Sequence, residues 1–372
     1  MPTGIDVPRW TRRRSLAAAC AGIGAAMVAP VFAMEPPGPG RAAPSRRVAA
    51  AWDDAAGRHH VGLLHMDHAR VHVSASIEVP TRAHGLALEP DGSILAVARR
   101  PGEWLLRWRP QQPGDRHAAS WHWLEGDSRL NGHVLVDGDH LLTTETDQES
   151  GEGQLVRRDR ASLAATARWP TRGADPHAML MLPDGQLLVA NGGIASRPET
   201  GRAGLTLERM DSSLVFMSAS DGAVGRLLQV PDPRLSLRHL AWHRSGRVAV
   251  AMQAQHDDAQ QRADAPVLAL LDLARRRLHV VASSHGVAGY AGDVAAIDDH
   301  WFVSCPRAGA VMQFTLDGTL VGPLALQDAC ALAGAPDQSW GWASGRALAW
   351  QLETVPRSAG LGVSADNHAL AL

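Results

Sequence analysis

The feature that most constrains the fold is a pattern of paired apolar runs that recurs along the chain. In the copy from Asp175 to Gly193, a histidine precedes an apolar run, an Asp-Gly turn and a second apolar run. Two apolar runs joined by a turn rich in Asp or Gly are typical of a β-hairpin. Similar stretches, some of them weaker, begin at five other positions: His84, His133, His239, Asp293 and Cys330.

Further strand-like runs, such as Trp104–Trp108 and Ser213–Met217, lie between these hairpins. Each repeat therefore holds about four strands in about 40–60 residues, which is typical of a β-propeller blade. Six repeats are visible, and the segment from Val48 to Pro80 supplies strands for another. We expect an all-β, seven-bladed β-propeller over residues 48–372. A pair of β-sandwiches would fit the strand spacing, but not the recurrence of the same opening residue.

The N-terminus has the features of an export signal of the twin-arginine type. The arginines Arg12, Arg13 and Arg14 precede a mildly apolar stretch, Ala17–Val28, and Val31-Phe32-Ala33 offers a cleavage site. The stretch is too short and too weakly apolar for a membrane anchor, which needs about 20 residues. We expect a signal peptide over residues 1–33, a flexible lead-in over 34–47, no membrane span in the mature chain, and a periplasmic location.

The net charge limits the classes of ligand, and the cysteines raise the question of a disulfide. A net charge of −2 and a pI near 6.8 argue against a nucleic-acid-binding protein, which would show a basic patch. An oxidising periplasm permits a disulfide between Cys305 and Cys330, but the spacing does not distinguish a disulfide from two buried thiols.

The recurring histidine is the main candidate for function. The first strand of a propeller blade lines the central channel, so a residue just before that strand should lie at the channel mouth. Imidazole and carboxylate groups together bind transition metals. We expect iron or copper, held by a subset of six residues: His84, His133, His177, His239, Glu145 and Asp293. In the alternative interpretation, each histidine joins neighbouring blades by bonding a backbone carbonyl.

Arginines and amides follow several of the second apolar runs. Guanidinium groups suit carboxylates and phosphates, so a ligand bearing such anions is expected at the same rim. The predicted ligand-binding residues are Arg99, Arg100, Asn191, Arg238, Gln253 and Arg307.

Several segments carry a resemblance to a known family. They are RRPG from Arg99, the Gly132-His133 pair, LLTTETDQESGEG from Leu141, the stretch Asp175–Gly193, SRPETGR from Ser196, MDSSLV from Met210, LSLRHLAW from Leu235, CPRAG from Cys305, DAC from Asp328, and the C-terminal DNHALAL. In this respect the chain resembles the exported bacterial proteins grouped as domain of unknown function 1513.

The resemblance implies a propeller with a twin-arginine signal, but no established activity. It also implies a link to periplasmic iron acquisition, with imelysin-like and di-haem oxidoreductase-like proteins as partners. The chain departs from the family pattern at Ser128–Asn131 and at Glu145–Asp147, on one blade's rim. The C-terminal copy, Asp366-Asn367-His368, looks like a strand that returns to close the ring.

These observations favour a non-enzymatic protein that binds a metal, a metal chelate or a partner protein at the channel mouth. Two alternatives stay open, because fold does not imply function. One is a lactonase-like or dehydrogenase-like enzyme that uses a metal in the channel. The other is an interaction scaffold in which the histidines are structural.

Overall fold

The structure is a computed structural model that describes residues 46–372, apart from 67–69, 111–117, 195–206, 208–209, 283–285 and 354–355. The expected signal peptide and residues 34–45 of the expected lead-in lie outside the described residues. The first strand already begins at Arg46, two residues before the expected start of the propeller. No helix within the described ranges has the length and apolar character needed to cross a membrane.

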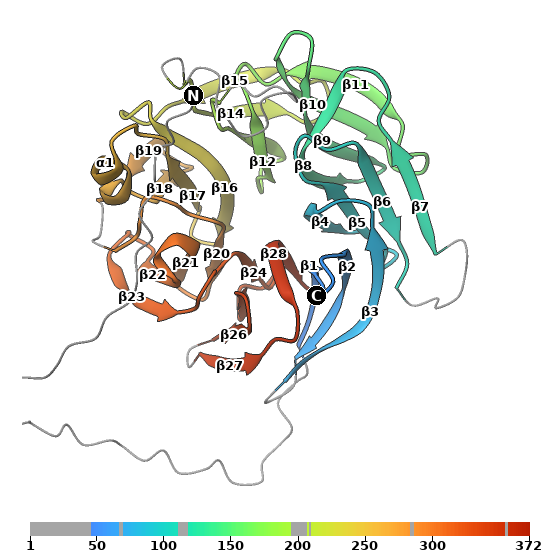
Figure 1. Cartoon of the computed structure of the whole chain (residues 1–372). Coiled ribbons are helices and arrows are strands. Elements are labelled where there is room, and N and C mark those ends of the chain that lie inside the picture. The colour runs from blue at the N-terminus through green and yellow to red at the C-terminus, as the bar shows by residue number, and fades with distance from the viewer. Residues whose placement is uncertain are drawn as a thin grey trace, which may run out of the picture. The chain divides into compact units, whose positions relative to one another are not determined.

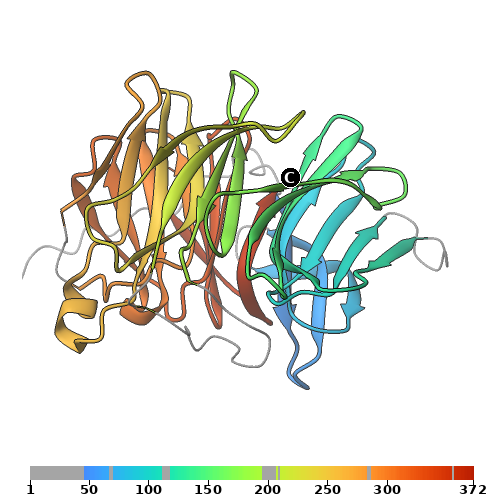
Figure 2. The same ribbon diagram turned by 90° about the horizontal axis from the view of Figure 1, so that it is seen from above.

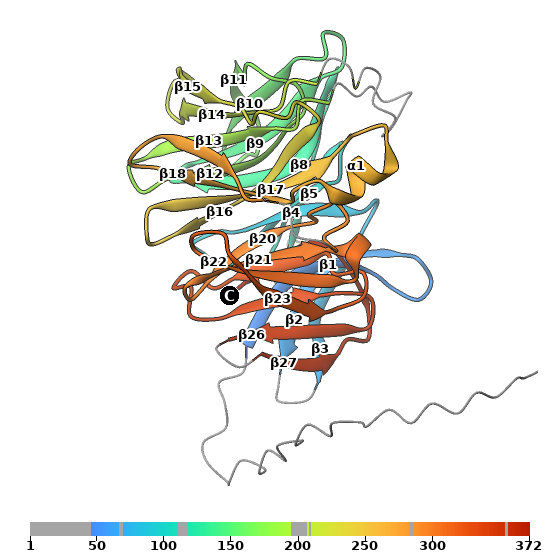
Figure 3. The same cartoon turned by 90° about the vertical axis from the view of Figure 1, so that its left-hand side faces the viewer.

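Seven four-stranded antiparallel sheets stand around a common centre, which confirms the predicted seven-bladed propeller (Figure 1). The first strands of neighbouring blades contact one another around the channel. Seen from two further directions, the blades lie side by side, and the short helix α1 (Ala259–Asp264) projects at the periphery (Figures 2 and 3). The sequence did not predict α1, which Asp258 caps by accepting a hydrogen bond from the Gln261 amide.

The blades are numbered in chain order, with the innermost strand of each given first. Blade 1 is β28 (Ser364–Ala371), β1 (Arg46–Asp53), β2 (His59–Met66) and β3 (Val71–Val79). Blade 2 is β4 (Ala83–Leu88), β5 (Ile94–Ala98), β6 (Trp104–Trp108) and β7 (Ala119–Trp123). Blade 3 is β8 (Ser128–Asp137), β9 (His140–Asp147), β10 (Gly153–Asp159) and β11 (Ala165–Pro170). Blade 4 is β12 (Pro176–Met181), β13 (Gln186–Asn191), β14 (Ser213–Ser218) and β15 (Val224–Leu228).

Blade 5 is β16 (Leu235–His243), β17 (Arg247–Ala254), β18 (Leu268–Asp272) and β19 (Arg277–Val280). Blade 6 is β20 (Val294–Ile297), β21 (His300–Cys305), β22 (Ala310–Thr315) and β23 (Leu320–Ala325), with a 3₁₀ turn at Pro306–Ala308. Blade 7 is β24 (Ala331–Gly334), β25 (Gly341–Ser344), β26 (Leu348–Leu352) and β27 (Arg357–Gly360).

The two ends of the propeller meet in blade 1. The C-terminal strand β28 pairs antiparallel with β1, with Ala371 opposite Val48 and Ala369 opposite Ala50. The red end of the chain therefore lies beside the blue start in Figure 1. This confirms the expectation that the C-terminal copy closes the ring, and it covers the apolar sheet faces that an open array would expose at its two ends.

The hydrophobic core consists of seven clusters, one between each pair of neighbouring blades. Because side chains alternate along a strand, one strand serves two clusters. On β1, Val48, Ala50 and Trp52 pack against blade 7, whereas Ala49 and Ala51 pack against blade 2. The near-continuous apolar runs of the sequence therefore reflect strands buried on both faces.

The tryptophans allow a test of this core. Trp342 is 1% exposed in the cluster between blades 7 and 1, whereas Trp123 is 51% exposed on an outermost strand. We expect Trp342→Ala to lower the free energy of unfolding by about 3–5 kcal/mol, because it leaves a large cavity. Trp123→Ala should change it by less than about 0.5 kcal/mol. Urea denaturation followed by circular dichroism measures both, and equal losses would contradict this core arrangement.

Candidate functional site

Five histidines lie on the innermost strands of five blades: His84 on β4, His133 on β8, His177 on β12, His239 on β16 and His368 on β28. Each one lies where the pairing of its strand with the next strand shifts register. Extra residues in one strand form a β-bulge, which bends the strand and redirects a side chain. The sequence placed four of them, His84, His133, His177 and His239, just before the strands; the structure places all five inside the strands, at the bulges.

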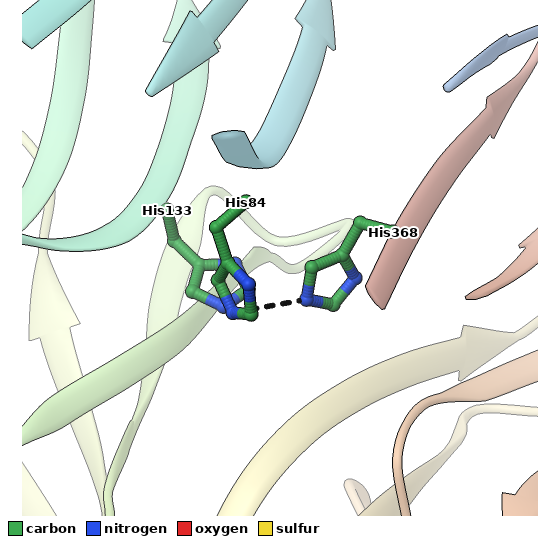
Figure 4. Close-up of side chains that lie close together, drawn as sticks. All are labelled: His84, His133 and His368. Atoms are coloured by element: carbon green, nitrogen blue, oxygen red, sulfur yellow. Dashed lines mark hydrogen bonds between the residues drawn. The ribbon is translucent and has the colours of Figure 1, made fainter. Parts of the chain in front are cut away.

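The five imidazoles form one cluster in the channel. The centroid of the His84 ring lies 5.1 Å from that of His133, 5.3 Å from His177, 6.1 Å from His239 and 4.4 Å from His368. The side chains of His84, His133 and His368 point toward one another from their separate strands (Figure 4). The channel is therefore narrow enough at this level for several histidines to share one ligand.

The closest approaches in the cluster join ring nitrogens. The Nε2 atom of His84 lies 3.2 Å from Nε2 of His368 and 3.4 Å from Nε2 of His177. Two nitrogens that bind one tetrahedral metal at 2.0–2.1 Å are about 3.3 Å apart. Without a metal, Nε2 of His84 can form an N–H···N hydrogen bond with one of these two neighbours at a time.

Asp293 orients the cluster from blade 6. Its carboxylate accepts hydrogen bonds from the backbone amides of Val294 and Leu332, and its Oδ2 lies 3.1 Å from Nδ1 of His368. Because an ionised carboxylate only accepts, Nδ1 of His368 donates and Nε2 presents its lone pair to the channel. A carboxylate behind an imidazole is the usual arrangement around a metal-binding histidine.

Burial favours the neutral form of four of the five imidazoles and leaves several ring nitrogens without a hydrogen-bond partner. Burial lowers the pKa of His84, His133, His177 and His239 well below the usual range of histidine, and neighbouring imidazoles and arginines lower it further. Three ring nitrogens are buried without a hydrogen-bond partner: Nδ1 of His84, Nδ1 of His177 and Nε2 of His133. Neutral imidazole is the form that binds metal.

The alternative role of the histidines as blade connectors is not what the structure shows. Within the described ranges, none of the five rings bonds a backbone carbonyl; their bonds join other imidazoles or Asp293. Other side chains connect the blades. Thr144 bonds the carbonyl of His177, Ser236 bonds that of Gly192, and Ser304 bonds that of Cys330.

Three sets of residues bring one ligand atom each to within 4.8 Å of one another. The sets are His84, His133 and His368; His84, His177 and His239; and His239, Asp293 and His368. His84, His239 and His368 each belong to two sets. The three sets therefore describe a single cluster of possible metal ligands. The structure therefore brings together five of the six residues predicted as metal ligands and adds His368.

A cavity of about 500 Å³ lies over three of these histidines: His84, His177 and His239. Its other charged lining residues are Arg82, Arg99, Arg100, Arg238, Arg307 and Asp175. We call the five arginines the arginine collar. Five of the six residues predicted to bind a ligand line this cavity: Arg99, Arg100, Arg238, Gln253 and Arg307.

Asp175 holds two members of the collar. One oxygen of its carboxylate accepts a hydrogen bond from Arg100, and the other lies 2.6 Å from Nη1 of Arg238. Burial raises the pKa of Asp175, but the two guanidinium groups outweigh burial and lower it overall. A Cβ at Gly192 would lie 2.7 Å from Nη1 of Arg238, so a larger residue there would displace this guanidinium group.

Glu145 and Asn191 lie apart from the histidine cluster. Glu145 is completely buried, and Arg158, Ser128 and Thr143 donate hydrogen bonds to its carboxylate. Asn191 donates hydrogen bonds to the carbonyl of Thr171 and the hydroxyl of Ser213. In this structure both side chains form hydrogen bonds within the protein scaffold instead of facing the channel. Gln253 lines the cavity, and its amide also donates to the carbonyl of Ala291.

The sequence analysis missed three polar residues of the site: His368, Asp175 and Arg82. A usable signal was present, because Arg82 and Asp175 each stand two residues before a clustered histidine and line the cavity. Asp366 occupies the same position relative to His368 and accepts both hydrogen bonds of a bidentate pair with Arg82. The position two residues before the histidine therefore belongs to the site on blades 1, 2 and 4, whereas on blade 5 it is Leu237, which packs in the core.

Cys305 and Cys330 are free thiols in the structure. Burial raises the pKa of Cys305 to about 12 and, with help from nearby carboxylates, that of Cys330 to about 11. Cys330 lines the cavity, at the place on blade 7 where other blades carry a histidine. At neutral pH both side chains are protonated, which favours structural thiols over reactive ones.

Fold and site together define a seven-bladed propeller with a histidine cluster and an arginine collar in its channel. The chain belongs to a family described as "Protein of unknown function (DUF1513)", whose sequence profile matches residues 77–372. A search of curated proteins found no match.

Solved structures with the same fold have little sequence identity to this chain. A protein from Bacteroides uniformis, provisionally described as a 6-phosphogluconolactonase, has a TM-score of 0.60 at 11% identity, over 88% of this chain and 99% of that one. Virginiamycin B lyase from Staphylococcus aureus has a TM-score of 0.54 at 8% identity, over 74% of this chain and 83% of that one. At such identities the likeness shows the fold alone.

Gly132 gives a test of how the backbone places His84. It has a φ of +98°, and a Cβ there would lie 2.5 Å from Cδ2 of His84. Gly138 also has a positive φ, but a Cβ there would meet nothing within 4 Å. We expect both alanine variants to lose about 1 kcal/mol of stability from backbone strain. Only Gly132→Ala should also displace the imidazole and weaken metal binding at least tenfold, as measured by titration; equal metal affinities would contradict this.

The neutral imidazoles predict a dependence of stability on pH in metal-free protein. The unfolded state takes up protons near pH 6.5, whereas the buried histidines do so only at lower pH. Stability should therefore be complete above about pH 7 and fall as the pH drops below 6.5, by up to about 1.4 kcal/mol per histidine per pH unit. Urea denaturation of EDTA-treated protein at pH 7.5, 6.5 and 5.5 measures the slope. The same slope in a His177→Ala, His239→Ala variant would contradict the assignment.

Proposed function

We propose that this protein binds a divalent transition-metal ion at the five-histidine cluster of its channel. The observation that carries the proposal is the convergence of Nε2 atoms from His84, His177 and His368 at separations of 3.2 and 3.4 Å. Three further features support it: the lowered pKa of the buried rings, the buried and unpartnered Nε2 of His133, and the carboxylate of Asp293 behind His368.

The set formed by His84, His177 and His239 is the best candidate for the ligands. All three line the cavity, and their ligand atoms lie within 4.8 Å of one another. Three protein ligands leave at least one coordination position for an outside group. In this arrangement that position faces the cavity, and His133 and His368 complete the cluster around the same centre.

Imidazole donors suit iron, copper, zinc and nickel, so the donor set defines a class of metals. Within that class we propose iron or copper, and a role as a binding protein in periplasmic iron acquisition. The supports are the arginines and apolar stretch at residues 12–28 and the family resemblance. Imelysin-like and di-haem oxidoreductase-like proteins are the proposed partners.

The direct test is elemental analysis of protein purified without a histidine tag. The wild type should carry, or after dialysis take up, about one iron, copper or other first-row ion per chain. His177→Ala, His239→Ala should lose most of that metal, because two of the three cavity-facing ligands are gone. The affinity for added Co²⁺, followed by its visible absorption, should fall at least a hundredfold.

The matched control is His72→Ala, His279→Ala, which removes two exposed histidines from outermost strands. It should keep the metal content and cobalt affinity of the wild type. A wild-type protein that stays metal-free and binds no added Co²⁺, Zn²⁺ or Fe²⁺ would overturn the proposal. A loss of metal in both double variants would show binding to surface histidines instead.

A further inference from the structure

We propose that the arginine collar binds a small polycarboxylate together with the metal, so that the channel takes an anionic metal complex rather than a bare ion. The inference rests on the proposed metal site and adds the chemical class of its second ligand. It is carried by the surplus of positive charge around the cavity and by the fact that the collar and three of the clustered histidines line the same cavity.

The charges around the site do not balance. Five arginines line the cavity, and three carboxylates lie beside them or in the cluster: Asp175, Asp366 and Asp293. The metal-free site therefore carries an excess of two positive charges when the imidazoles are neutral. A divalent cation raises the excess to four. Because like charges in a partly buried site repel one another more strongly than in bulk water, the metal should bind more tightly when an anion accompanies it.

The collar has guanidinium groups available for such an anion. Arg99 and Arg307 have no carboxylate partner among the described residues, and Arg307 lies over the ring of Tyr290, 4.3 Å from its centroid. Arg238 is 1% exposed, and its Nε is buried without a partner. Asp175 already shows how the collar takes a carboxylate, with one oxygen on Arg100 and the other on Arg238.

The distribution of the arginines favours a polycarboxylate over a single phosphate. Arg99 and Arg100 follow strand β5 of blade 2, Arg238 lies on β16 of blade 5, and Arg307 follows β21 of blade 6. Asp175 already engages Arg100 and Arg238 with a single carboxylate, whereas Arg99 and Arg307 come from two other places on the ring, so carboxylates spaced along a short chain can pair with several of these groups at once. The cavity of about 500 Å³ has the volume of a small-molecule site.

A polycarboxylate would also complete the metal site. The histidines that line the cavity leave a coordination position open toward the collar, and carboxylate oxygens bind iron and copper readily. The metal and the anion should therefore bind cooperatively. By linkage, each must raise the affinity of the other by the same factor.

The test uses the full-length protein, stripped with EDTA, with Co²⁺ as the metal and tricarballylate as the anion. Tricarballylate is a tricarboxylate that chelates metals more weakly than citrate, so it competes less for the cobalt. Calorimetry gives its affinity for metal-free and cobalt-loaded protein, and the visible absorption of cobalt reports a change in its ligands. We expect at least about tenfold tighter binding to the loaded protein and a changed cobalt spectrum. Phosphate and acetate should show neither effect at equal concentration.

Paired arginine variants locate the site. Arg99→Gln, Arg307→Gln should weaken tricarballylate binding at least tenfold while the protein still binds Co²⁺. Arg275→Gln, Arg277→Gln, on an exposed turn and the outermost strand β19, should leave it unchanged. Equal losses in the two variants would overturn the assignment to the collar.

The outcomes separate the two proposals. If Co²⁺ binds the histidines but tricarballylate binds loaded and metal-free protein equally, or neither, the inference is wrong and the metal site stands. Coupling to phosphate alone would overturn the choice of a polycarboxylate. If the wild type binds no Co²⁺ with or without the anion, the proposed function itself is wrong.

Discussion

The pairing of β28 with β1 is the interaction on which the rest of the structure depends. A propeller blade is buried on both faces, so every sheet needs two neighbours, and an open array would expose an apolar face at each end. The ladder between the two ends of the chain makes blade 1 from both and completes the seventh interface. The same strand carries Asp366 to Arg82 and His368 to His84. Closing the ring and assembling the site are thus one event.

Much of this fold could be predicted from the sequence because the hairpins repeat. Copies of one pattern predict equivalent positions in space, so His84, His133, His177 and His239 could be grouped without a structure. His368 escaped because its strand pairs with the opposite end of the chain rather than with a neighbour in sequence. The bulges escaped as well, since an extra residue in one strand of a ladder leaves no reliable mark in an apolar run.

Glu145 shows where equivalence by sequence fails. It stands near the end of a second hairpin strand, as predicted for the rim, but side chains alternate between the two faces of a strand. Its own side chain therefore meets Arg158 inside the sheet stack instead of the channel. The place of a residue along its strand determines its level in the channel. The direction of its side chain depends on how that strand pairs with its neighbours, which the sequence does not show.

The histidine cluster is poorly explained as a device for stability. A buried polar atom without a hydrogen bond costs about 1–3 kcal/mol, and three ring nitrogens of the cluster are in that state. Apolar side chains would fill the channel at lower cost, as they do between the blades. The arginines that line the same cavity oppose protonation of the rings and so help to keep them neutral. Buried polar groups that lack hydrogen-bond partners but are positioned to bind a ligand are typical of a functional site. Here the neutral imidazoles suit a cation and the guanidinium groups suit an anion, so the two layers fit two parts of one ligand.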